Sequence, residues 1–555
     1  MKPLFTKLRC NEITFNFSAA LFFTLILNGI FILRAWETLS YLHFRDYLFA
    51  ATIPLVLFCG FTLIFSVLAL PWLRKPLLAV LIIAGAAANY FIYSFGTVID
   101  TNMIQNVFET DVQEATALFS LRYLVWMMLL GVLPAALLCL VKIDNHRPWW
   151  MAIAWRAVWS LGAVMLIVLI AALFYKDYAS MIRNNKGLVK MVTPANVVSG
   201  VGHYVDNRWF VGKQTLVRIG EDARKGPTIL AARKKTLVIF VLGETARAEN
   251  FSLGGYSRET NPKLQRDNVI YYQHASSCGT ETAISVPCLF SNMPRENYDA
   301  ALAHHQEGLL DVMAHAGINV LWRENDGGCK GACNRVPHTD MTQWNVSALC
   351  QHDYCLDDVL LHRLNNYLDG IKDDTVVVLH QMGSHGPAYY LRYPAEMRRF
   401  TPTCDSNQIQ DCDHQALVNT YDNSVLYTDS MLDSTISLLK TYSDKFNVAM
   451  VYLSDHGESL GERGMYLHGT PYLFAPSQQT HIPFLLWMSA DYASTFGINQ
   501  QCLQQQAQHD NVSQDNIFHT LLGMFNVQTT QYDPRLDMIR SCRPGGEKVE
   551  SDRSV

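Results

Sequence analysis

The chain has 555 residues, 50% of them apolar, and a formal net charge of −5 at pH 7. So small a charge on so long a chain gives no sign of nucleic-acid binding. The apolar residues are concentrated in the first third of the sequence, which argues against an ordinary soluble protein.

Five stretches of this first third contain no Asp, Glu, Lys or Arg, and each is about 19 residues or longer, enough for a helix to cross a hydrocarbon layer. They cover residues 13–33, 47–73, 77–99, 123–141 and 157–175. Buried core helices are the alternative, but soluble cores rarely supply five such runs in succession. A cleaved signal peptide is the alternative for the first run, but no small-x-small cleavage site follows it. We therefore predict a transmembrane domain of five helices over residues 1–175.

Lysine and arginine are unevenly distributed between the short loops that join these helices. The loops on the side of the N-terminus hold seven of them, namely Lys2, Lys7, Arg9, Arg74, Lys75, Lys142 and Arg147, and the opposite loops hold Arg34, Arg45 and Arg122. Because short positive loops stay in the cytoplasm, we expect the N-terminus there. Five crossings then deliver everything after Lys176 to the far side of the membrane.

Ten of the thirteen cysteines follow residue 270, and their spacing is largely local. We predict disulfides between neighbours, namely Cys278–Cys288, Cys329–Cys333, Cys350–Cys355 and Cys404–Cys412, with Cys502 and Cys542 left as the fifth pair. Sequence alone does not fix this connectivity. A zinc–thiolate site is the alternative for Cys329 and Cys333. Local disulfides are typical of an oxidising compartment such as the periplasm.

Residues 176–233 form a mixed-charge connector, either a plain linker or an amphipathic segment at the membrane surface. Beyond it, five short apolar runs alternate with longer stretches of helical character, at residues 236–242, 318–322, 375–381, 448–454 and 482–488. Such runs are typical of strands buried on both faces of a mostly parallel sheet. We therefore predict an α/β domain over residues 234–543 and a polar tail over residues 544–555.

Polar side chains follow these runs at the carboxyl ends of the predicted strands, where ligands gather in such sheets. They are Glu244 after the first run, His380 and His385 at the third, Asp455, His456 and Glu458 after the fourth, and His468 a little later. A capped turn or a hydrogen-bonded structural histidine would explain any one of them alone. Together these oxygen and imidazole groups predict a zinc or manganese site.

The stretch SSCGTETAISVPCLF, residues 276–290, places small and hydroxylated residues between two cysteines. If Thr282 begins a helix, its hydroxyl and the free N–H groups of the first turn face any phosphate bound there. Coordination to zinc would activate the hydroxyl as a nucleophile. The alternative is that Thr282 only caps a helix beside a disulfide.

A resemblance is carried by four long segments together with the five preceding apolar spans. The segments are GETARAENFSLGGYSRETNP, SCGTETAISVPCLFS, LHQMGSHGPAYYLRYP and LSDHGESLGERGMYLHG. They are similar to the phosphoethanolamine transferases that modify lipid A in Gram-negative bacteria, members of the alkaline phosphatase and sulfatase superfamily. The resemblance covers nearly the whole chain. It implies five transmembrane helices followed by an alkaline phosphatase-like α/β domain with a mostly parallel sheet.

The resemblance implies a zinc ion held by Glu244, Thr282, Asp455 and His456, with Thr282 as the nucleophile between the paired Cys278 and Cys288. Groups that some members associate with a second metal match His385 and His468, and Lys330 matches a phosphate contact. His380 and Glu458 match supporting residues. Related enzymes have an asparagine where this chain has Asp326. The loop MIQNVFETDVQEA supplies Asn106, Thr110 and Glu114, which match lipid headgroup contacts, although an ordinary polar helix face would look the same.

The implied reaction transfers phosphoethanolamine from phosphatidylethanolamine to a phosphate of lipid A through a covalent phosphoethanolamine–threonine intermediate. The implied setting is the inner membrane, as a monomer, with the catalytic domain in the periplasm. A modified lipid A carries less negative charge and should bind cationic peptides such as polymyxin less well. The alternatives are another acceptor, such as a lipopolysaccharide core sugar or a protein; a glycerophosphate polymerase or sulfatase; and a non-catalytic membrane receptor.

Overall fold

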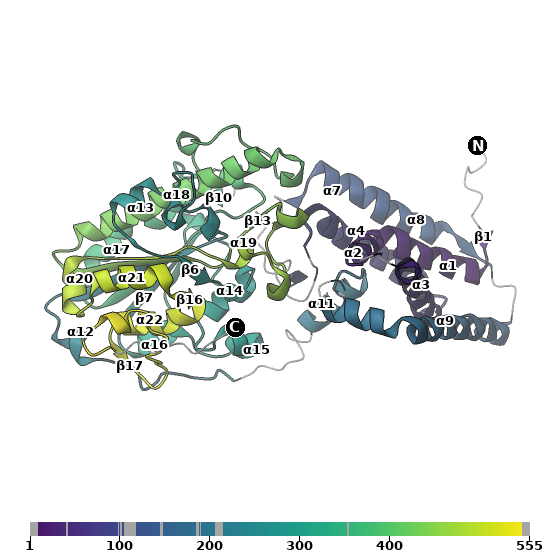
Figure 1. Ribbon diagram of the computed structural model, residues 1–555, viewed down its shortest axis with the longest axis horizontal. Coiled ribbons are helices and arrows are strands. Elements are labelled where there is room, and N and C mark those ends of the chain that lie inside the picture. The colour runs from purple at the N-terminus through teal and green to yellow at the C-terminus, as the bar shows by residue number, and fades with distance from the viewer. Residues whose placement is uncertain are drawn as a thin grey trace. The chain divides into compact units, whose positions relative to one another are not determined.

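The computed structural model divides the chain into two compact units. It describes residues 9–546 except 40, 42, 98, 100–102, 105–117, 145–147, 185–187, 189, 206–214 and 352–353. The first unit is helical and is drawn from the first 208 residues, and the second is an α/β unit that follows it (Figure 1). The division at Arg208 lies inside the predicted connector.

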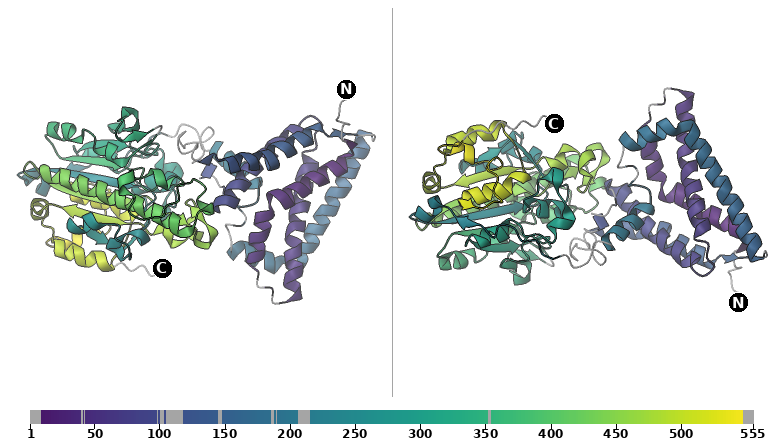
Figure 2. Two further views of the ribbon diagram at one scale, coloured as in Figure 1. Left: turned by 90° about the horizontal axis from the view of Figure 1, so that it is seen from above. Right: turned by 90° about the horizontal axis from the view of Figure 1, so that it is seen from below.

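The first unit is built from long apolar helices, which Figure 2 shows from two further directions. Four of them are long and apolar enough to cross a membrane, and a bent pair gives a fifth candidate. The elements are β1 (Arg9–Cys10), α1 (Glu12–Phe22), η1 (Phe23–Leu27), α2 (Gly29–Glu37), α3 (Phe44–Val67), α4 (Arg74–Phe95), α7 (Leu121–Trp126), η2 (Met127–Val132), α8 (Leu133–Leu140), β2 (Lys142–Ile143), α9 (Trp149–Asn184) and α11 (Ala195–Val205). Most residues of the five predicted apolar stretches lie on these helices.

The bent pair corresponds to the first predicted span. The helices Glu12–Leu27 and Gly29–Glu37 meet at an angle of 54° at Asn28. The side chain of Asn28 is buried, donates to the carbonyl oxygens of Phe23 and Thr193 and accepts from the N–H of Thr193. A polar residue in the apolar run thus satisfies backbone groups that the break exposes.

A seven-stranded sheet forms the centre of the second unit, with the order β5-β15-β12-β4-β11-β7-β8. Its strands are β4 (Lys235–Gly243), β5 (Ile270–Tyr272), β7 (Asn319–Glu324), β8 (His338–Asp340), β11 (Thr375–His380), β12 (Phe446–Ser454) and β15 (Phe484–Met488). The five strands from β12 to β8 run parallel, and β15 and β5 add an antiparallel edge. The prediction of an α/β domain with a mostly parallel sheet is therefore confirmed.

Helices cover both faces of this sheet (Figure 1). Alternate residues of β4, namely Val238, Phe240 and Leu242, belong to a core that also includes residues of α14, α16, α21 and α22. The opposite face carries α17 and α18. Because both faces are covered, β4 is buried from Thr236 to Gly243, which explains why its sequence is apolar without alternation.

The remaining elements of the second unit connect these layers. The helices are α12 (Pro227–Ala231), α13 (Pro262–Arg266), α14 (Thr282–Leu289), α15 (Ala300–Ala303), α16 (Leu309–His315), α17 (Leu364–Gly370), α18 (His414–Thr441), α19 (Ser477–Thr480), α20 (Ala490–Thr495), α21 (Gln500–His509) and α22 (Ile517–Met524). The short strands are β3 (Arg224–Lys225), β6 (His274–Ser276), β9 (Cys350–Gln351), β10 (Tyr354–Cys355), β13 (Ser459–Leu460), β14 (Tyr466–Leu467), β16 (Asn511–Ser513) and β17 (Val527–Gln528).

Five disulfides join neighbouring loops of the second unit. They pair Cys278 with Cys288, Cys329 with Cys333, Cys350 with Cys355, Cys404 with Cys412 and Cys502 with Cys542. This is the pairing that local spacing predicts. Cys329 and Cys333 form a disulfide here and not the thiolate pair of a zinc site.

Candidate active site

The carboxyl ends of four adjacent parallel strands place a row of polar side chains at one edge of the sheet. Ser454 of β12 pairs with Gly243 of β4, and His380 of β11 pairs with Leu242 of β4 and with Glu324 of β7. Because these strands end in register, the residues that follow them lie together. Glu244 therefore stands between Asp455 and His456, which follow β12, and His380 and Glu324, which end β11 and β7.

Thr282 is the first residue of α14, as predicted, and its hydroxyl faces Glu244 from the other wall of the site. Thr282 Oγ1 lies 3.3 Å from each carboxylate oxygen of Glu244 and 3.4 Å from Nε2 of His456. Nε2 of His456 lies in turn 3.3 Å from Glu244 Oε1 and 3.3 Å from Asp455 Oδ2. We call Thr282, Asp455 and His456 the threonine side of Glu244.

Asp455 and His456, the two candidate metal ligands after β12, are held by hydrogen bonds. These bonds leave one ligand atom of each residue directed into the site. Nδ1 of His456 donates to the carbonyl oxygen of Gly457, which leaves the Nε2 lone pair directed into the site. Burial lowers the pKa of His456 to about 4, so the imidazole is neutral at neutral pH. Asp455 accepts the N–H groups of Thr245 and His456 through Oδ1, and its Oδ2 makes no hydrogen bond within the described residues.

The threonine side of Glu244 fits a tetrahedral divalent ion. Zinc binds nitrogen and oxygen at about 2.0–2.1 Å, which spaces its ligand atoms roughly 3.3–3.4 Å apart. Thr282 Oγ1 lies 3.3 to 3.4 Å from Glu244 and His456, and His456 Nε2 lies 3.3 Å from Glu244 and Asp455. Glu244, Asp455 and His456 are completely buried, and buried carboxylates of this kind are usually paired or bound to metal. The donor chemistry, the spacing and the orphaned Asp455 oxygen thus agree with the metal site expected from the sequence.

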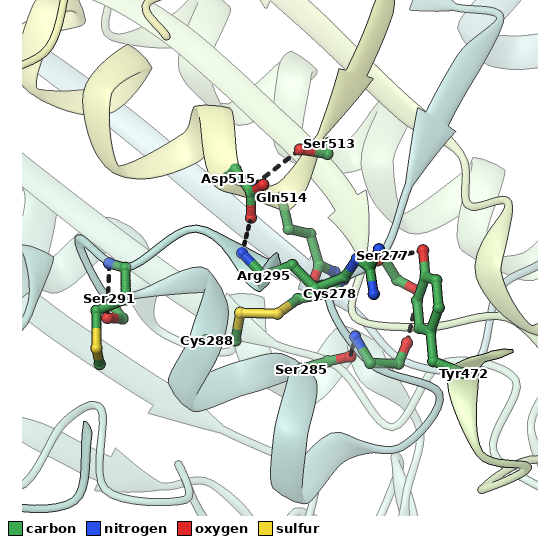
Figure 3. The surroundings of a disulfide bond; sticks show 12 residues. Ser277, Cys278, Ser285, Cys288, Ser291, Arg295, Tyr472, Ser513, Gln514 and Asp515 are labelled. Atoms are coloured by element: carbon green, nitrogen blue, oxygen red, sulfur yellow. Dashed lines mark hydrogen bonds between the residues drawn. A yellow bond between two sulfur atoms is a disulfide. The ribbon is translucent and has the colours of Figure 1, made fainter. Parts of the chain in front are cut away.

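The loop before Thr282 is fixed by its disulfide and by a buried glutamine (Figure 3). Cys278 is bonded to Cys288 on α14, and the N–H of Cys278 donates to Gln514 Oε1 at 2.8 Å. Nε2 of Gln514 donates to the carbonyl oxygens of Ser454 and Asp455. Gln514 therefore connects the loop before Thr282 directly to the end of β12. Ser285 closes the turn by accepting the N–H of Gly279.

A second pair of predicted residues lies beside the threonine side. The ring centroid of His468 is 4.5 Å from that of His456 and 5.3 Å from that of His385. Nδ1 of His468 lies 3.2 Å from Glu458 Oε2, and Glu458 is buried. The side chain of His468 retains 15% exposure, so it can meet a ligand that enters from solvent. His385 and His468 thus extend from His456 as a row of neighbouring rings.

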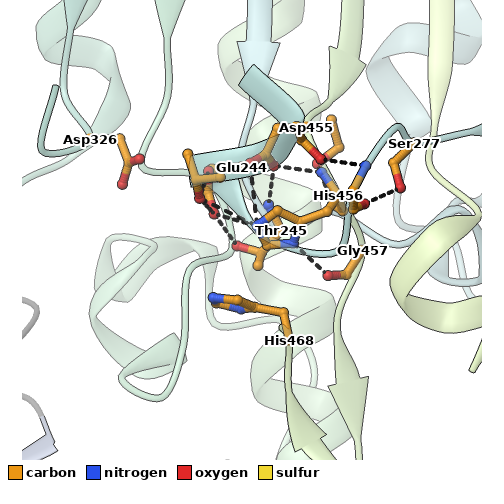
Figure 4. A network of polar contacts seen from close by, with 12 residues as sticks. Glu244, Thr245, Ser277, Asp326, Asp455, His456, Gly457 and His468 are labelled. Carbon is orange, nitrogen blue, oxygen red and sulfur yellow. Dashed lines mark hydrogen bonds and ion pairs between the residues drawn. The ribbon is translucent and has the colours of Figure 1, made fainter. Parts of the chain in front are cut away.

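The other side of Glu244 carries Asp326 and His380, which we call the Asp326 side (Figure 4). Nε2 of His380 lies 3.7 Å from Asp326 Oδ2, and its Nδ1 lies 3.3 Å from Glu324 Oε2. Burial disfavours the charged form of His380, but the carboxylates of Glu324 and Asp326 outweigh burial and raise its pKa to about 9. Lys330 follows nearby in the chain, with its Nζ 3.5 Å from the carbonyl oxygen of Gly327.

Some functional candidates lie outside the described residues, and others were not found from the sequence. Asn106, Thr110 and Glu114 fall in the range 105–117, which the structure does not describe. Glu324 ends β7, just beyond the predicted run 318–322, so inspecting the residues after that run would have found it. Gly383 has a φ of +52°, and a Cβ there would collide with the backbone of Glu244. The sequence alone does not reveal the role of Gly383, because a glycine is required there only by the close packing of the segments that follow β4 and β11.

Comparisons with known proteins match both parts of the chain to known families. Residues 57–209 match the family model described as phosphoethanolamine transferase EptA/EptB, and residues 236–527 match the sulfatase model. The phosphoethanolamine transferase EptA of Escherichia coli K12 is 47% identical over 544 residues, which are 98% of this chain and 99% of that protein. Phosphatidylethanolamine transferase Mcr-1 of E. coli is 36% identical, covering 89% of this chain and 91% of its own length.

A solved structure shows the same architecture over almost the full length. The integral membrane lipooligosaccharide phosphoethanolamine transferase A (EptA) from Neisseria meningitidis superimposes with a TM-score of 0.92 at 38% identity, covering 97% of this chain and 99% of that one. The soluble domain of the Neisseria protein also matches, with a TM-score of 0.58 at 43% identity over 60% of this chain and 99% of the domain. The chain therefore belongs to the membrane-anchored phosphoethanolamine transferases of the alkaline phosphatase and sulfatase superfamily, and it is an enzyme of that family.

Proposed function

We propose that the protein transfers phosphoethanolamine from phosphatidylethanolamine to a phosphate of lipid A, with Thr282 as the nucleophile. The observation that carries this proposal is the position of the Thr282 hydroxyl, at the start of α14 and within 3.3 to 3.4 Å of Glu244 and His456. A threonine whose only role is to cap a helix would not need a buried carboxylate and a neutral imidazole facing its oxygen.

Glu244, Thr282, Asp455 and His456 are the residues that would hold Zn²⁺ at this position. An ion held there would favour loss of the Thr282 hydroxyl proton to water and would polarise a phosphoryl oxygen. The neutral state of His456 suits this role, because only an unprotonated imidazole nitrogen binds a metal.

In the first step Thr282 Oγ attacks the phosphorus of phosphatidylethanolamine. The Oγ–P bond forms while the bond from phosphorus to the diacylglycerol oxygen breaks, and diacylglycerol leaves after taking up a proton. His468 would give that proton, and the position of its partly exposed ring, with its centroid 4.5 Å from that of His456, supports this role. His385, 5.3 Å from His468 between ring centroids, is the second candidate for this proton transfer.

In the second step a phosphate oxygen of lipid A attacks the same phosphorus. The Oγ–P bond breaks, Thr282 regains a proton, and the ethanolamine-bearing phosphoryl group ends on the acceptor. Free N–H groups at the start of α14 and the ammonium group of Lys330 would offset the charge that spreads over the phosphoryl oxygens, where most of the rate enhancement in such transfers arises. Asp326, His380 and Glu458 would support these groups, and Asn106, Thr110 and Glu114 would contact the lipid headgroup.

Both proposed substrates are lipids, which gives the helical unit a direct purpose. We propose that it anchors the enzyme in the inner membrane of a Gram-negative bacterium as a monomer, with the α/β unit in the periplasm. The uneven loop charge and the five disulfides support this orientation. Adding an ethanolamine amine to lipid A lowers its negative charge, so cationic peptides such as polymyxin should bind less well.

Mass spectrometry of the protein tests the nucleophile. After incubation of the full-length enzyme with phosphatidylethanolamine, the peptide that contains Thr282 should gain the mass of one phosphoethanolamine group. Thr282→Ala should lose the adduct and the transfer activity while keeping its melting temperature, and Thr282→Ser should retain part of both. An active Thr282→Ala enzyme would refute the role of Thr282.

Mass spectrometry of lipopolysaccharide tests the acceptor. Expression in a Gram-negative host that lacks such modification should add the phosphoethanolamine mass to lipid A and should raise resistance to polymyxin. A mass increase on the core sugar alone would identify another acceptor. No mass increase on any lipopolysaccharide fragment, together with an intact Thr282 adduct, would leave a protein or another lipid as the acceptor and would contradict the lipid A proposal.

A further inference from the structure

The Asp326 side of Glu244 is a second cluster of metal-ligand atoms, separate from the threonine side. Among the described residues, one ligand atom from each of Glu244, Asp326 and His380 lies within 4.8 Å of the others. The three residues come from the ends of β4, β7 and β11, and none is more than 8% exposed. Glu244 belongs to both clusters, and Figure 4 shows Asp326 on one side of it and His456 on the other.

His380 is held in the orientation of a metal ligand. Its Nδ1 faces Glu324 Oε2, so its Nε2 points away from Glu324 toward Asp326. This Nε2 is completely buried, makes no hydrogen bond within the described residues and lies 3.7 Å from Asp326 Oδ2, beyond hydrogen-bond distance. With a proton on Nε2 these two groups form a long ion pair, and without that proton they are spaced as two ligands of one ion.

Glu324 supplies the support that metal-bound histidines need. Its Oε2 accepts the indole N–H of Trp322, and its Oε1 accepts the backbone N–H groups of Asp326 and Gly328. The Glu324 carboxylate therefore orients His380 and closes the loop that carries Asp326. Metal-binding histidines generally donate their other N–H to a carboxylate or carbonyl in this way. On the threonine side, the carbonyl oxygen of Gly457 does the same for His456.

The formal charge of the strand edge also favours a second cation. Glu244, Asp326, Glu324 and Asp455 place four carboxylates together, each at most 8% exposed. One divalent ion on the threonine side offsets part of that charge. On the Asp326 side, the carboxylates of Glu324 and Asp326 favour a proton on His380, and a divalent ion bound at its Nε2 would take the place of that proton.

We propose that the Asp326 side binds a second divalent transition-metal ion, with Glu244, Asp326 and His380 as its ligands. Two carboxylates and one imidazole suit zinc or manganese and leave coordination positions for water or a phosphate oxygen. This site differs from the pair His385 and His468. Among the described residues, no set of three ligand atoms lying within 4.8 Å of one another includes either of these two histidines. The proposal does not rest on the identity of the acceptor or on the Thr282 intermediate.

The test is a metal count on the purified full-length protein in detergent. The protein is stripped with a chelator, dialysed against buffered Zn²⁺ and measured by inductively coupled plasma mass spectrometry. The wild type should bind two zinc ions per chain. Asp326→Asn keeps the shape of the side chain but removes its charge, and it should bind one, with affinity for the second ion reduced by roughly 10- to 100-fold. His380→Gln should also bind one, so the test does not depend on a single variant.

Matched variants exclude indirect effects. Asp340→Asn makes the same substitution at an exposed position of β8, opposite Glu324 in the sheet, and should keep two ions. His385→Ala and His468→Ala should also keep two. A wild type that binds one ion, an Asp326→Asn variant that keeps two, or loss of an ion only in the His385 or His468 variant would overturn the proposal. The Thr282 adduct, measured in the same samples, reports separately on the proposed transferase chemistry.

Discussion

The two sides of Glu244 present one histidine each in very different states. On the threonine side, Nδ1 of His456 donates to a carbonyl oxygen, and burial keeps the ring neutral. On the Asp326 side, Nδ1 of His380 faces the carboxylate of Glu324, and the surrounding carboxylates favour the charged ring. Both imidazoles are completely buried. The comparison shows that the group facing Nδ1, more than burial itself, decides whether a buried histidine is neutral or charged.

Removing the carboxylate of Glu244, which both clusters share, should prevent metal binding on both sides. Glu244→Gln keeps the shape of the side chain but supplies a weaker neutral ligand to each cluster. We expect both zinc ions to be lost and phosphoethanolamine transfer to fall by roughly 10²–10³-fold or more, because charge stabilisation in the transition state is lost with them. Metal analysis and a transfer assay on the same preparation measure the two effects.

The control for this variant is Glu259→Gln, which removes an exposed carboxylate paired with Arg399. Exposed ion pairs contribute little, so this enzyme should keep its metal and its activity. If Glu244→Gln retained one ion, the carboxylate would belong to one side only, and the shared-ligand comparison would be wrong.

Gln514 allows the threonine side to be weakened without touching the Asp326 side. Gln514→Leu removes the acceptor for the N–H of Cys278 and the donor for the carbonyl oxygens of Ser454 and Asp455. Leaving these buried groups unpaired should cost on the order of 2 kcal/mol of unfolding free energy. The melting temperature should fall by roughly 3–4 °C. We expect transfer to fall about tenfold, because Asp455 and the Thr282 loop lose their connection.

Gln505→Leu is the matched control, since Gln505 is exposed on α21. The informative measurement is the metal count of Gln514→Leu. The ion on the Asp326 side should remain bound, while the ion on the threonine side should bind more weakly. Equal weakening of both ions would show that the two sides behave as one site.

Much of this arrangement follows from local sequence patterns. Apolar runs without alternation predict the buried strands β4, β7, β11, β12 and β15, and the polar residues after them predict where a ligand binds. The physical reason is general, because parallel strands covered on both faces must be apolar throughout and must end at a common edge. The residues around Thr282 also permit the helix start that α14 has there.

The rest depends on contacts between distant segments. The pairing of His380 with Glu324 requires the strand order β4-β11-β7, and the connection through Gln514 joins residues 236 positions apart in the chain. The bend at Asn28 depends on hydrogen bonds to Thr193. The antiparallel direction of β15 is also invisible in its apolar run, since parallel and antiparallel buried strands have similar composition. These features come from register and packing, which no short sequence window contains.

A third buried histidine, away from Glu244, is a reference against which the pKa values of His456 and His380 can be compared. His519 on α22 is 4% exposed, and its Nδ1 accepts the N–H of Asp533. Burial lowers its pKa to about 4, although the Asp533 carboxylate opposes the change. An unfolded histidine has a pKa near 6.5, so the unfolded chain takes up a proton between pH 6.5 and 4 that the folded chain does not. The stabilisation is complete above about pH 6.5 and declines as the pH falls.

His519→Asn should remove this dependence, because the amide oxygen can accept the same N–H without titrating. Between pH 7.5 and 5.5 the wild type should lose about 1 kcal/mol more than the variant, or roughly 2 °C in melting temperature. The measurement compares the change within each protein between the two pH values, so a constant cost of the substitution cancels. Equal changes in both proteins would mean that His519 already carries a proton when folded, and burial alone would then not keep a histidine neutral in this unit.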